Sequence, residues 1–370
     1  MALPGTVLIG TYTGGDGPAG ESRGIYAADW DGGTGTLGAP RLFAEIENPS
    51  FLALNPSRPL LYAASETGRF QGKDSGAVAV VRLDGDGPAV EPPVSSQGTH
   101  PCHVTVDPSG EFLVVSNYGS GTAAVFHLVD GRPAEAAIVL RLSGHGPDPE
   151  RQAGPHAHSS FFDPTGERFY VQDLGTDRIW GFVLARADRT VRPLDPPYCQ
   201  MTAGSGPRHL AFHPREPRAY VINELDNTVT AMNWDRDTGV LVPFQTVNSL
   251  PESVKVVSYC ADIRVSPDGA YLYGSNRGHD SIAVWRIDPG QGRLALIQHI
   301  SSGGGHPRNF TISPDGRWLL CANMDGDNIV VFRRDPGNGL LERTSAVPAP
   351  RPVCLLFHAA LRGKPGDERS

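Results

Sequence analysis

The chain has 370 residues, of which 44 are glycine and 33 are proline, and its formal net charge is −8. Glycine and proline interrupt helices, so about one such residue in five excludes a helical bundle, yet the proportion stays below that of low-complexity disordered chains. The negative charge argues against a nucleic-acid or anionic-membrane surface. The composition favours many short strands joined by turns.

The N-terminus, MALPGTVLIG, has no basic segment and no long apolar segment, and it continues directly into sequence typical of a strand. We therefore expect no signal peptide. No apolar run reaches the roughly 20 residues that a membrane-spanning helix needs. The five cysteines are scattered and form no CxxC pair, which is typical of buried thiols in a cytoplasmic protein.

A repeat of about 50 residues runs through the chain. Each copy has a short apolar strand, a turn of the xPxG type and a second strand that ends in a small polar residue; a third strand and a weaker fourth strand follow. The turns are anchored on Pro56, Pro108, Pro164, Pro214, Pro267 and Pro314, at spacings of 52, 56, 50, 53 and 47 residues. Four short strands in a repeat of this length predict the blades of a β-propeller.

The two ends of the chain supply one further blade. Segment 353–358 matches the first strand of a repeat, whereas 6–12, 24–30 and 34–46 match the second, third and fourth strands. One C-terminal strand and three N-terminal strands would complete this blade and leave no open sheet edge. We therefore predict an all-β fold, a single seven-bladed propeller with four antiparallel strands per blade at 1–360, and a polar tail at 361–370.

Aligning the repeats on the turn proline reveals polar positions at one end of the innermost strands. Six residues before the proline stand Ser50, Cys102, His158, Arg208, Ala261 and Arg308, and five before it stand Phe51, His103, Ser159, His209, Asp262 and Asn309. The second strands end with the pairs Thr11–Tyr12, Ser65–Glu66, Asn117–Tyr118, Asp173–Leu174, Asn223–Glu224, Asn276–Arg277 and Asn323–Met324. In an antiparallel pair these positions are neighbours, so they are predicted to meet at one mouth of the channel, where a ligand would bind.

The positions differ in what they imply. Asn and Asp commonly cap turns, so the recurring residues at the end of the second strand have an architectural explanation. Charged residues that occur in single blades do not serve a repeated structural need. We therefore predict a functional role for His103, His158, Arg208, Glu224, Arg277 and Arg308.

A metal site is one alternative, because His156 and His158 share one face of a strand, with His103, His209 and Asp262 as conceivable further ligands. The nearby arginines would repel a cation, so we predict no metal and no cofactor, and histidines that act as a base or hydrogen-bond donor.

The sequence motifs give little support to a serine nucleophile, a nucleotide-binding site or a cysteine nucleophile. The chain has no GxSxG nucleophile elbow and no phosphate-binding P-loop, so a serine-hydrolase mechanism has no support. The GxGxxG matches at 15–20 and 33–38 lie outside any strand–helix unit, and we interpret them as loops. Cys102 is the one cysteine among the mouth positions, which leaves a thiol nucleophile as a less favoured alternative.

The segments PHAHSSFFDP (155–164), GPRHLAFHP (206–214), SNRGH (275–279) and HPRNFTISP (306–314) resemble the lactonase family of seven-bladed propellers, which includes bacterial 6-phosphogluconolactonases and fungal carboxy-muconate lactonising enzymes. The resemblance covers nearly the whole chain. It implies a carboxylic ester hydrolase of carbohydrate metabolism that converts 6-phosphogluconolactone to 6-phosphogluconate, a step of the pentose phosphate pathway. It also implies His158, Arg208, Glu224 and Arg277 as catalytic residues. His156 and His158 are partly interchangeable as matches to the family's catalytic histidine.

Lactone hydrolysis requires an activated water, a stabilised carbonyl oxygen and protonation of the leaving alkoxide. We expect His158 or Glu224 to activate water, and Arg208 and Arg277 to hold the oxyanion or an anionic group of the substrate. The expected substrate-binding residues are His103, His156, Asn117, Asp173, Asn223, Asn276, Arg308 and Asn309.

Two other functions stay open: action on another carboxylated lactone or a muconate, and a non-catalytic interaction scaffold. We expect a small-molecule sugar lactone as the partner, with no nucleic acid and no membrane; the sequence does not predict the oligomeric state.

Overall fold

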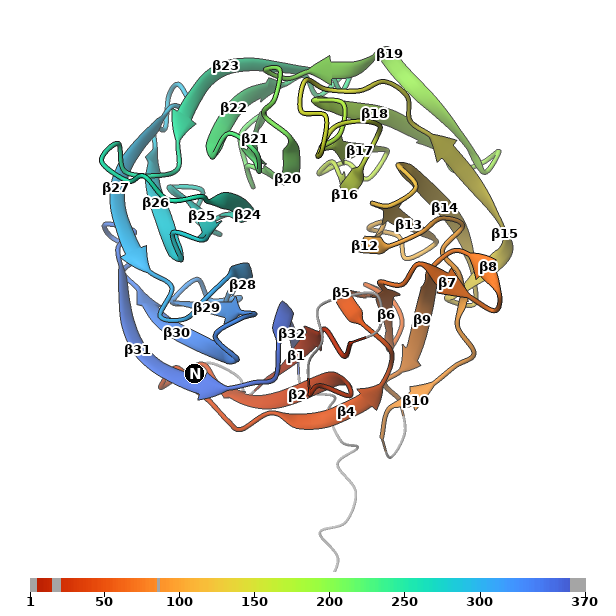
Figure 1. The fold of residues 1–370 in the computed structure, drawn as a ribbon, viewed down its shortest axis with the longest axis horizontal. Helices are drawn as coiled ribbons and strands as arrows, with labels where there is room; N and C mark the ends of the chain where they lie inside the picture. Colours follow the sequence, from red (N-terminus) through yellow and green to blue (C-terminus); the bar gives the residue numbers. More distant parts are fainter. Residues whose placement is uncertain (1–4, 15–20, 85–86, 360–370) are drawn as a thin grey trace, which may run out of the picture.

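The computed structural model of the protein describes residues 5–14, 21–84 and 87–359. Within these ranges every regular element is a β-strand, and the strands form seven blades around a central channel (Figure 1). The prediction of an all-β, seven-bladed propeller is therefore confirmed. The described part of the chain has no helix long and apolar enough to cross a membrane.

The strands of each blade follow one another from the channel outward. Blade 1 has β5 (Pro49–Leu54), β6 (Leu60–Ser65), β9 (Ala77–Arg82) and two short outer strands, β10 (Ala89–Val90) and β11 (Val94–Ser95); a small hairpin, β7 (Arg69–Phe70) and β8 (Lys73–Asp74), follows β6. Blade 2 has β12 (Pro101–Val106), β13 (Phe112–Asn117), β14 (Thr122–Val129) and β15 (Arg132–Arg141). Blade 3 has β16 (Ala157–Phe162), β17 (Arg168–Asp173), β18 (Arg178–Ala185) and β19 (Thr190–Gln200).

The next three blades repeat this order with four strands each. Blade 4 has β20 (Pro207–Phe212), β21 (Arg218–Asn223), β22 (Thr228–Trp234) and β23 (Leu241–Asn248). Blade 5 has β24 (Tyr259–Val265), β25 (Tyr271–Arg277), β26 (Ser281–Ile287) and β27 (Leu294–Ser301). Blade 6 has β28 (Pro307–Ile312), β29 (Trp318–Asn323), β30 (Asn328–Arg334) and β31 (Leu341–Pro348).

Blade 7 closes the ring from both ends of the chain, as predicted. The C-terminal β32 (Pro352–Ala359) is innermost and pairs antiparallel with β1 (Gly5–Thr11), which pairs with β2 (Gly24–Asp31). The expected single outer strand is divided into β3 (Thr36–Leu37) and β4 (Arg41–Glu45), both paired with β2. Pro40 lies in the gap between them, where its missing N–H would break the ladder.

The recurring turn holds the first two strands of a blade together. In blade 2 the carboxylate of Asp107 accepts hydrogen bonds from the N–H groups of Glu111 and Phe112, at 2.9 and 2.7 Å. Gly110 completes the turn with φ +77°, a conformation that L side chains disfavour. A glycine with positive φ recurs at this position in blades 3, 5 and 6, whereas the proline recurs in all six repeats and therefore measures the repeat.

The core lies between neighbouring blades, where the faces of two sheets pack together. Between blades 1 and 2, for example, Tyr62 and Val80 pack with Leu113 and Phe126. Buried tyrosines also join blades by donating to a glycine carbonyl in the outer turn of the next blade. These pairs are Tyr62–Gly131 (2.6 Å), Tyr170–Gly239 (2.6 Å), Tyr220–Gly292 (3.1 Å) and Tyr273–Gly339 (2.8 Å). Each bond satisfies the polar end of an otherwise buried ring.

Candidate active site

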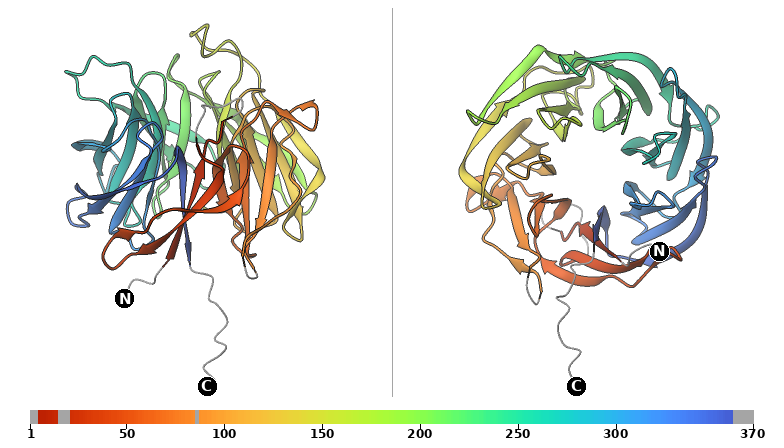
Figure 2. Two further views of the ribbon diagram at one scale, coloured as in Figure 1. Left: turned by 60° about the horizontal axis from the view of Figure 1, so that its bottom comes forward. Right: turned by 180° about the vertical axis from the view of Figure 1, so that it is seen from behind.

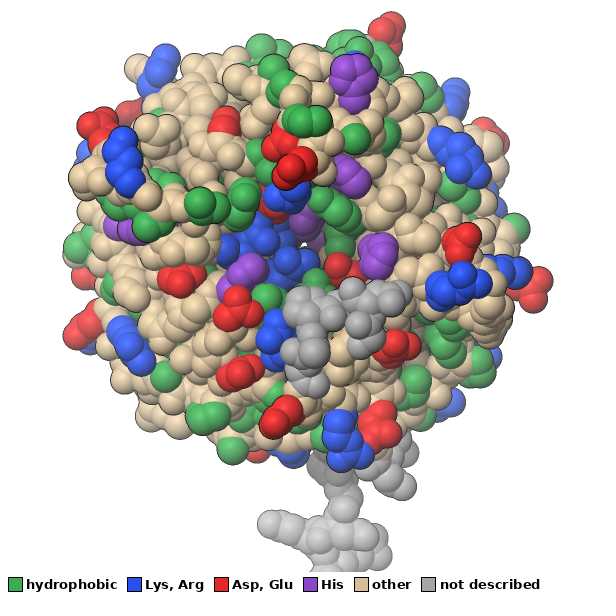
Figure 3. All heavy atoms as spheres, in the orientation of Figure 1, with side chains coloured by type: hydrophobic (Ala, Val, Ile, Leu, Met, Phe, Trp, Pro, Cys, Tyr) green, Lys and Arg blue, Asp and Glu red, His purple; other side chains and the backbone are tan. Residues whose placement is uncertain are grey.

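A β-bulge near the start of the innermost strand recurs around the ring. The register of strand pairing shifts at Pro49/Phe51, Pro101/His103, Ala157/Ser159, Pro207/His209, Cys260/Ile263 and Pro307/Asn309. A bulge leaves one residue unpaired and re-aims its side chain. The residues in this position include His158, Arg208 and Arg308, so the fold presents these three side chains at corresponding places of three blades. Figure 3 shows Lys and Arg side chains, with histidines, gathered in the hollow at the centre of this face.

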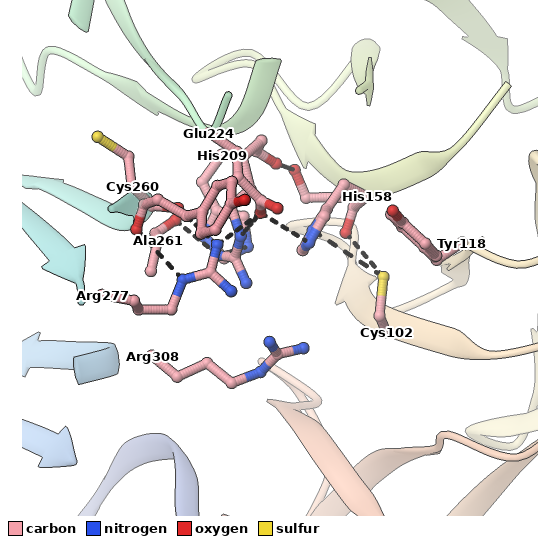
Figure 4. Close-up of polar contacts among 12 residues, drawn as sticks. Cys102, Tyr118, His158, His209, Glu224, Cys260, Ala261, Arg277 and Arg308 are labelled. Atoms are coloured by element: carbon pink, nitrogen blue, oxygen red, sulfur yellow. Dashed lines mark hydrogen bonds and ion pairs between the residues drawn. The ribbon is translucent and has the colours of Figure 1, made fainter. Parts of the chain in front are cut away.

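Glu224 is the centre of the charged cluster. Its Oε2 atom lies 2.9 Å from Nε of Arg208 and 2.7 Å from Nη2 of Arg277, and its Oε1 atom lies 2.6 Å from Nη2 of Arg151. Figure 4 shows Arg277 and His158 approaching Glu224 from two sides. Burial alone would raise the pKa of the Glu224 carboxyl, but Arg277, Arg208 and Arg151 outweigh it and hold that pKa well below its usual range.

Backbone carbonyls of blade 5 hold the two inner guanidinium groups. Nη1 of Arg208 donates to the carbonyl of Ala261 at 2.6 Å, and Nη2 of Arg277 donates to that of Cys260 at 2.8 Å. The Arg208 side chain is 2% exposed. Burial, Arg277 and Arg308 lower the pKa of Arg208 to about 9, so it still carries its charge at neutral pH.

His158 faces the same carboxylate. Its Nε2 atom lies 3.9 Å from Oε2 of Glu224, and the side chain is buried. Burial, with Arg208 and His209 adding to it, lowers the pKa of His158 well below its ordinary value, so the ring is neutral at neutral pH. A neutral imidazole beside a carboxylate can take up a proton, because the imidazolium that forms gains a counter-charge.

His156 occupies a different place from His158. Its ring stacks on Tyr118 at 4.5 Å between centroids, and Nδ1 lies 2.9 Å from the carbonyl oxygen of Tyr118. The backbone N–H of His156 donates to Asp173. The structure brings His158, and not His156, against Glu224.

Asp262 organises the neighbouring inner strands. Its Oδ1 atom lies 2.9 Å from Nδ1 of His209, and its Oδ2 atom accepts a bond from Nδ2 of Asn309 at 2.7 Å. Oδ1 of Asn309 accepts the N–H of Leu355 in the closing strand. Asn309, expected to contact substrate, is 1% exposed and instead links blades 5, 6 and 7.

An aromatic cluster lies beside these polar groups. The ring of His103 packs between Phe51 and Phe161, at centroid distances of 4.1 and 4.8 Å, and lies 5.6 Å from the ring of His209. Burial, with His209 and Arg264 adding to it, lowers the pKa of His103 well below its ordinary value. His103 is 1% exposed and packs among these rings.

Arg308 lies at the same mouth but outside the Glu224 contacts. Its Nη2 atom is 4.0 Å from Oε2 of Glu66, and its guanidinium carbon is 5.4 Å from the centroid of the Tyr12 ring. The Tyr12 hydroxyl donates to Glu66 at 2.8 Å. Figure 4 shows the Arg308 side chain extending into the site below Arg277.

Four residues at the ends of second strands were expected to bind substrate, but none of them joins the cluster around Glu224. Asn117, Asp173, Asn223 and Asn276 are at most 1% exposed. Their side chains bond to turns and neighbouring loops: Nδ2 of Asn223 donates to Thr228, for instance, and Asp173 accepts from the N–H of Gly175. These contacts are those of turn caps, so the architectural explanation accounts for this position.

The cysteine alternative gains no support from the geometry. Sγ of Cys102 is 3.1 Å from the carbonyl oxygen of His158, as a thiol donor would be, and burial raises the pKa of this thiol. All five cysteines are free; four are buried as expected, whereas Cys199 is half-buried.

Arg151 is the main site residue that the repeat alignment does not reveal. It lies in the connection from β15 to β16, outside every aligned position. A signal was present, because the longest spacing between turn prolines, 56 residues from Pro108 to Pro164, spans this connection. An insertion in one blade marks a loop with a role of its own.

Fold and site together define a seven-bladed propeller with a buried Arg–Glu–His cluster at one channel mouth. The sequence matches the family described as "Lactonase, 7-bladed beta-propeller" over residues 6–357, and the chain belongs to that family.

Known relatives agree with this assignment. A 6-phosphogluconolactonase of Bacillus subtilis (strain 168) is 34% identical over 306 residues, which cover 82% of this chain and 83% of the relative. A putative 6-phosphogluconolactonase structure from Bacteroides fragilis has a TM-score of 0.86 and 34% identity, covering 96% of this chain and 98% of its own. The structure of the Pseudomonas aeruginosa periplasmic gluconolactonase has a TM-score of 0.87 and 30% identity, covering 96% and 99%.

Proposed function

We propose that this protein is a lactonase that hydrolyses 6-phosphogluconolactone to 6-phosphogluconate. The observation that carries the proposal is the buried cluster in which Glu224 holds Arg208 and Arg277 beside the neutral ring of His158. The 6-phosphogluconolactonases among the relatives support the choice of substrate.

His158 is the base in this proposal. Glu224 is a poor base because its arginine partners stabilise the carboxylate, whereas neutral His158 has a free lone pair to accept a proton. Water attacks the carbonyl carbon as its proton passes to His158, and Glu224 stabilises the imidazolium. The ring C–O bond then breaks, and the leaving alkoxide takes the proton back from His158.

Arg208 and Arg277 stabilise the oxyanion. Among the contacts of the described residues, Arg208 uses three of its five N–H donors, which bond to Glu224, His209 and Ala261. Arg277 uses two, which bond to the carbonyls of Tyr259 and Cys260, and its guanidinium also forms an ion pair with Glu224. The remaining donors are held in place before substrate arrives, and preorganised donors of this kind supply much of the rate enhancement in acyl transfer.

The test is a coupled assay on freshly generated 6-phosphogluconolactone, with formation of 6-phosphogluconate as the readout. A rate no greater than the spontaneous hydrolysis would contradict the proposal. The unphosphorylated gluconolactone is the second candidate substrate, favoured by the likeness to a periplasmic gluconolactonase, and it is assayed in parallel.

A further inference from the structure

The connection between blades 2 and 3 is built differently from the corresponding connections. It runs from 142 to 156 and is longer than the segments 96–100, 201–206, 249–258 and 302–306, which lead into β12, β20, β24 and β28. The yellow-green loop projects above the ring of blades in the left view of Figure 2. A connection of this length that carries a site residue is a candidate functional element.

Hydrogen bonds hold this loop in place. Gln152 is fully buried, and its Nε2 atom donates to the carbonyl of Leu174 and to Oδ1 of Asp177, both at 2.8 Å. Asp177 also accepts the N–H groups of Gly204 and Gly206, just before Arg208. The position of the adjacent Arg151 is therefore fixed by a buried anchor and does not depend on its own ion pair.

Arg151 is the most exposed of the arginines that contact Glu224. Its side chain is 33% exposed, compared with 2% for Arg208 and 9% for Arg277. Its Nη2 atom lies 2.6 Å from Glu224 and 3.4 Å from the Tyr118 hydroxyl, and its guanidinium carbon is 5.5 Å from the centroid of the Tyr259 ring. The guanidinium thus stands at the rim of the cluster, within reach of solvent.

Among the described residues, the pairs around Glu224 and Glu66 carry more positive than negative charge. Four guanidinium groups face these two carboxylates, because Arg151, Arg208 and Arg277 share Glu224 while Arg308 lies near Glu66. The two buried histidines closest to this cluster, His158 and His209, are neutral at neutral pH. The surplus of two charges matches a phosphate monoester, which carries roughly −1.5 to −2 at pH 7.

We infer that Arg151 is the residue that selects phosphorylated lactones, by leaving Glu224 to bind the substrate's phosphate. This inference rests on the proposed function and adds to it the origin of substrate specificity. A 6-phosphate is remote from the lactone carbonyl, so its ligand belongs at the rim, while the buried Arg208 and Arg277 serve the carbonyl end. A guanidinium binds phosphate oxygens in bidentate fashion, which Lys cannot copy.

The experiment compares wild type, Arg151→Ala and Arg151→Lys on 6-phosphogluconolactone and on unphosphorylated gluconolactone. Loss of a charge-assisted contact should lower kcat/KM for the phosphorylated substrate roughly 10- to 100-fold, mainly through KM. The unphosphorylated substrate should change less than about 3-fold, and Lys should restore only part of the loss. Equal losses on both substrates would overturn the inference, because Arg151 would then act only by holding Glu224.

Arg58→Ala is the matched control, since Arg58 pairs with Asp130 at the far end of blade 1 and should alter neither substrate. Thermal melting of each variant checks that the fold is intact. A calorimetric comparison of 6-phosphogluconate with gluconate separates this inference from the proposed function. If wild type hydrolyses neither lactone, a preference for 6-phosphogluconate that Arg151→Ala abolishes still supports the role of Arg151. Equal binding of the two acids by wild type, or binding of neither, overturns it.

Discussion

His209 and Asp262, on the innermost strands of blades 4 and 5, are joined between Nδ1 and Oδ1 at 2.9 Å. Because a carboxylate can only accept, His209 donates from Nδ1, and its Nε2 atom is left as an acceptor. Nη1 of Arg208 lies 3.3 Å from that Nε2 atom. A chain of contacts therefore runs from Asp262 through His209 to the guanidinium of Arg208.

The first prediction concerns this chain. In Asp262→Asn the tautomer of His209 is no longer specified, so Arg208 loses a defined acceptor. We expect kcat to fall about 10-fold with little change in KM, and stability to fall by about 1–3 kcal/mol from the disturbed buried bonds. Steady-state kinetics and thermal melting measure both. An unchanged kcat in a destabilised variant would limit Asp262 to a structural role.

The second prediction concerns Arg208 itself. Arg208→Ala removes a preorganised donor, and we expect kcat to fall about 10²- to 10³-fold. Circular dichroism should show an intact fold, since Glu224 keeps Arg277 and Arg151 as partners. Arg208→Lys should recover little, because one ammonium group cannot reach both Glu224 and the Ala261 carbonyl as the planar fork does. Kinetics like those of wild type would remove Arg208 from the mechanism.

The third prediction concerns pH. Burial, followed by the nearby positive charge of Arg208, lowers the pKa of His158, so the base form that the reaction needs is fully present at pH 7. The kcat/KM profile should stay level as pH falls from 8 through 6.5 and decline only below that range. His158→Gln should lose the activity. An acid limb centred at or above pH 6.5 would argue against His158 as the base.

The fourth prediction is a dependence of stability on pH. The folded-state pKa of His103 lies below its unfolded value, so below about pH 6.5 the unfolded chain binds the extra proton and stability falls with falling pH. This residue should contribute a slope near 1.4 kcal/mol per pH unit around pH 5.5. When the free energy of unfolding of His103→Gln is measured in urea at several pH values, its slope against pH should be smaller than that of wild type by the amount that one bound proton contributes. The same slope as wild type would mean that His103 is protonated in the folded protein.

The fifth prediction concerns ring closure. Deleting residues 352–370 removes β32, which pairs with β1 along its whole length and covers the inner edge of blade 7. We expect a large loss of thermal stability and aggregation through the exposed strand edge. The predicted polar tail, 361–370, lies outside the described residues, and deleting it alone should leave the melting temperature unchanged. A loss of stability in that control would mean that the domain extends beyond 360.

The repeat itself was predictable because local chemistry sets it. Blades 1 to 6 keep a proline in the turn that joins their first two strands. Blades 2, 3, 5 and 6 also have a glycine with positive φ in this turn, whereas Arg58 and Glu216 take that position in blades 1 and 4. Counting these prolines predicted six blades, with the seventh blade and the closure predicted from the strand patterns at the two ends of the chain. It also placed His158, Arg208, Glu224 and Arg277 at one mouth, because strand ends in register must be neighbours in space.

The partners of each side chain depended on tertiary structure. Asn276 and Arg277 are adjacent in sequence, yet Asn276 bonds to the loop residue Ser249 while Arg277 reaches Glu224 in another blade. Arg151 enters the site from a connection outside the repeat, and Gln152 and Asp177 determine its course. A periodic pattern predicts only the residues that share its period, and an irregular loop is positioned by long-range hydrogen bonds that no local sequence feature encodes.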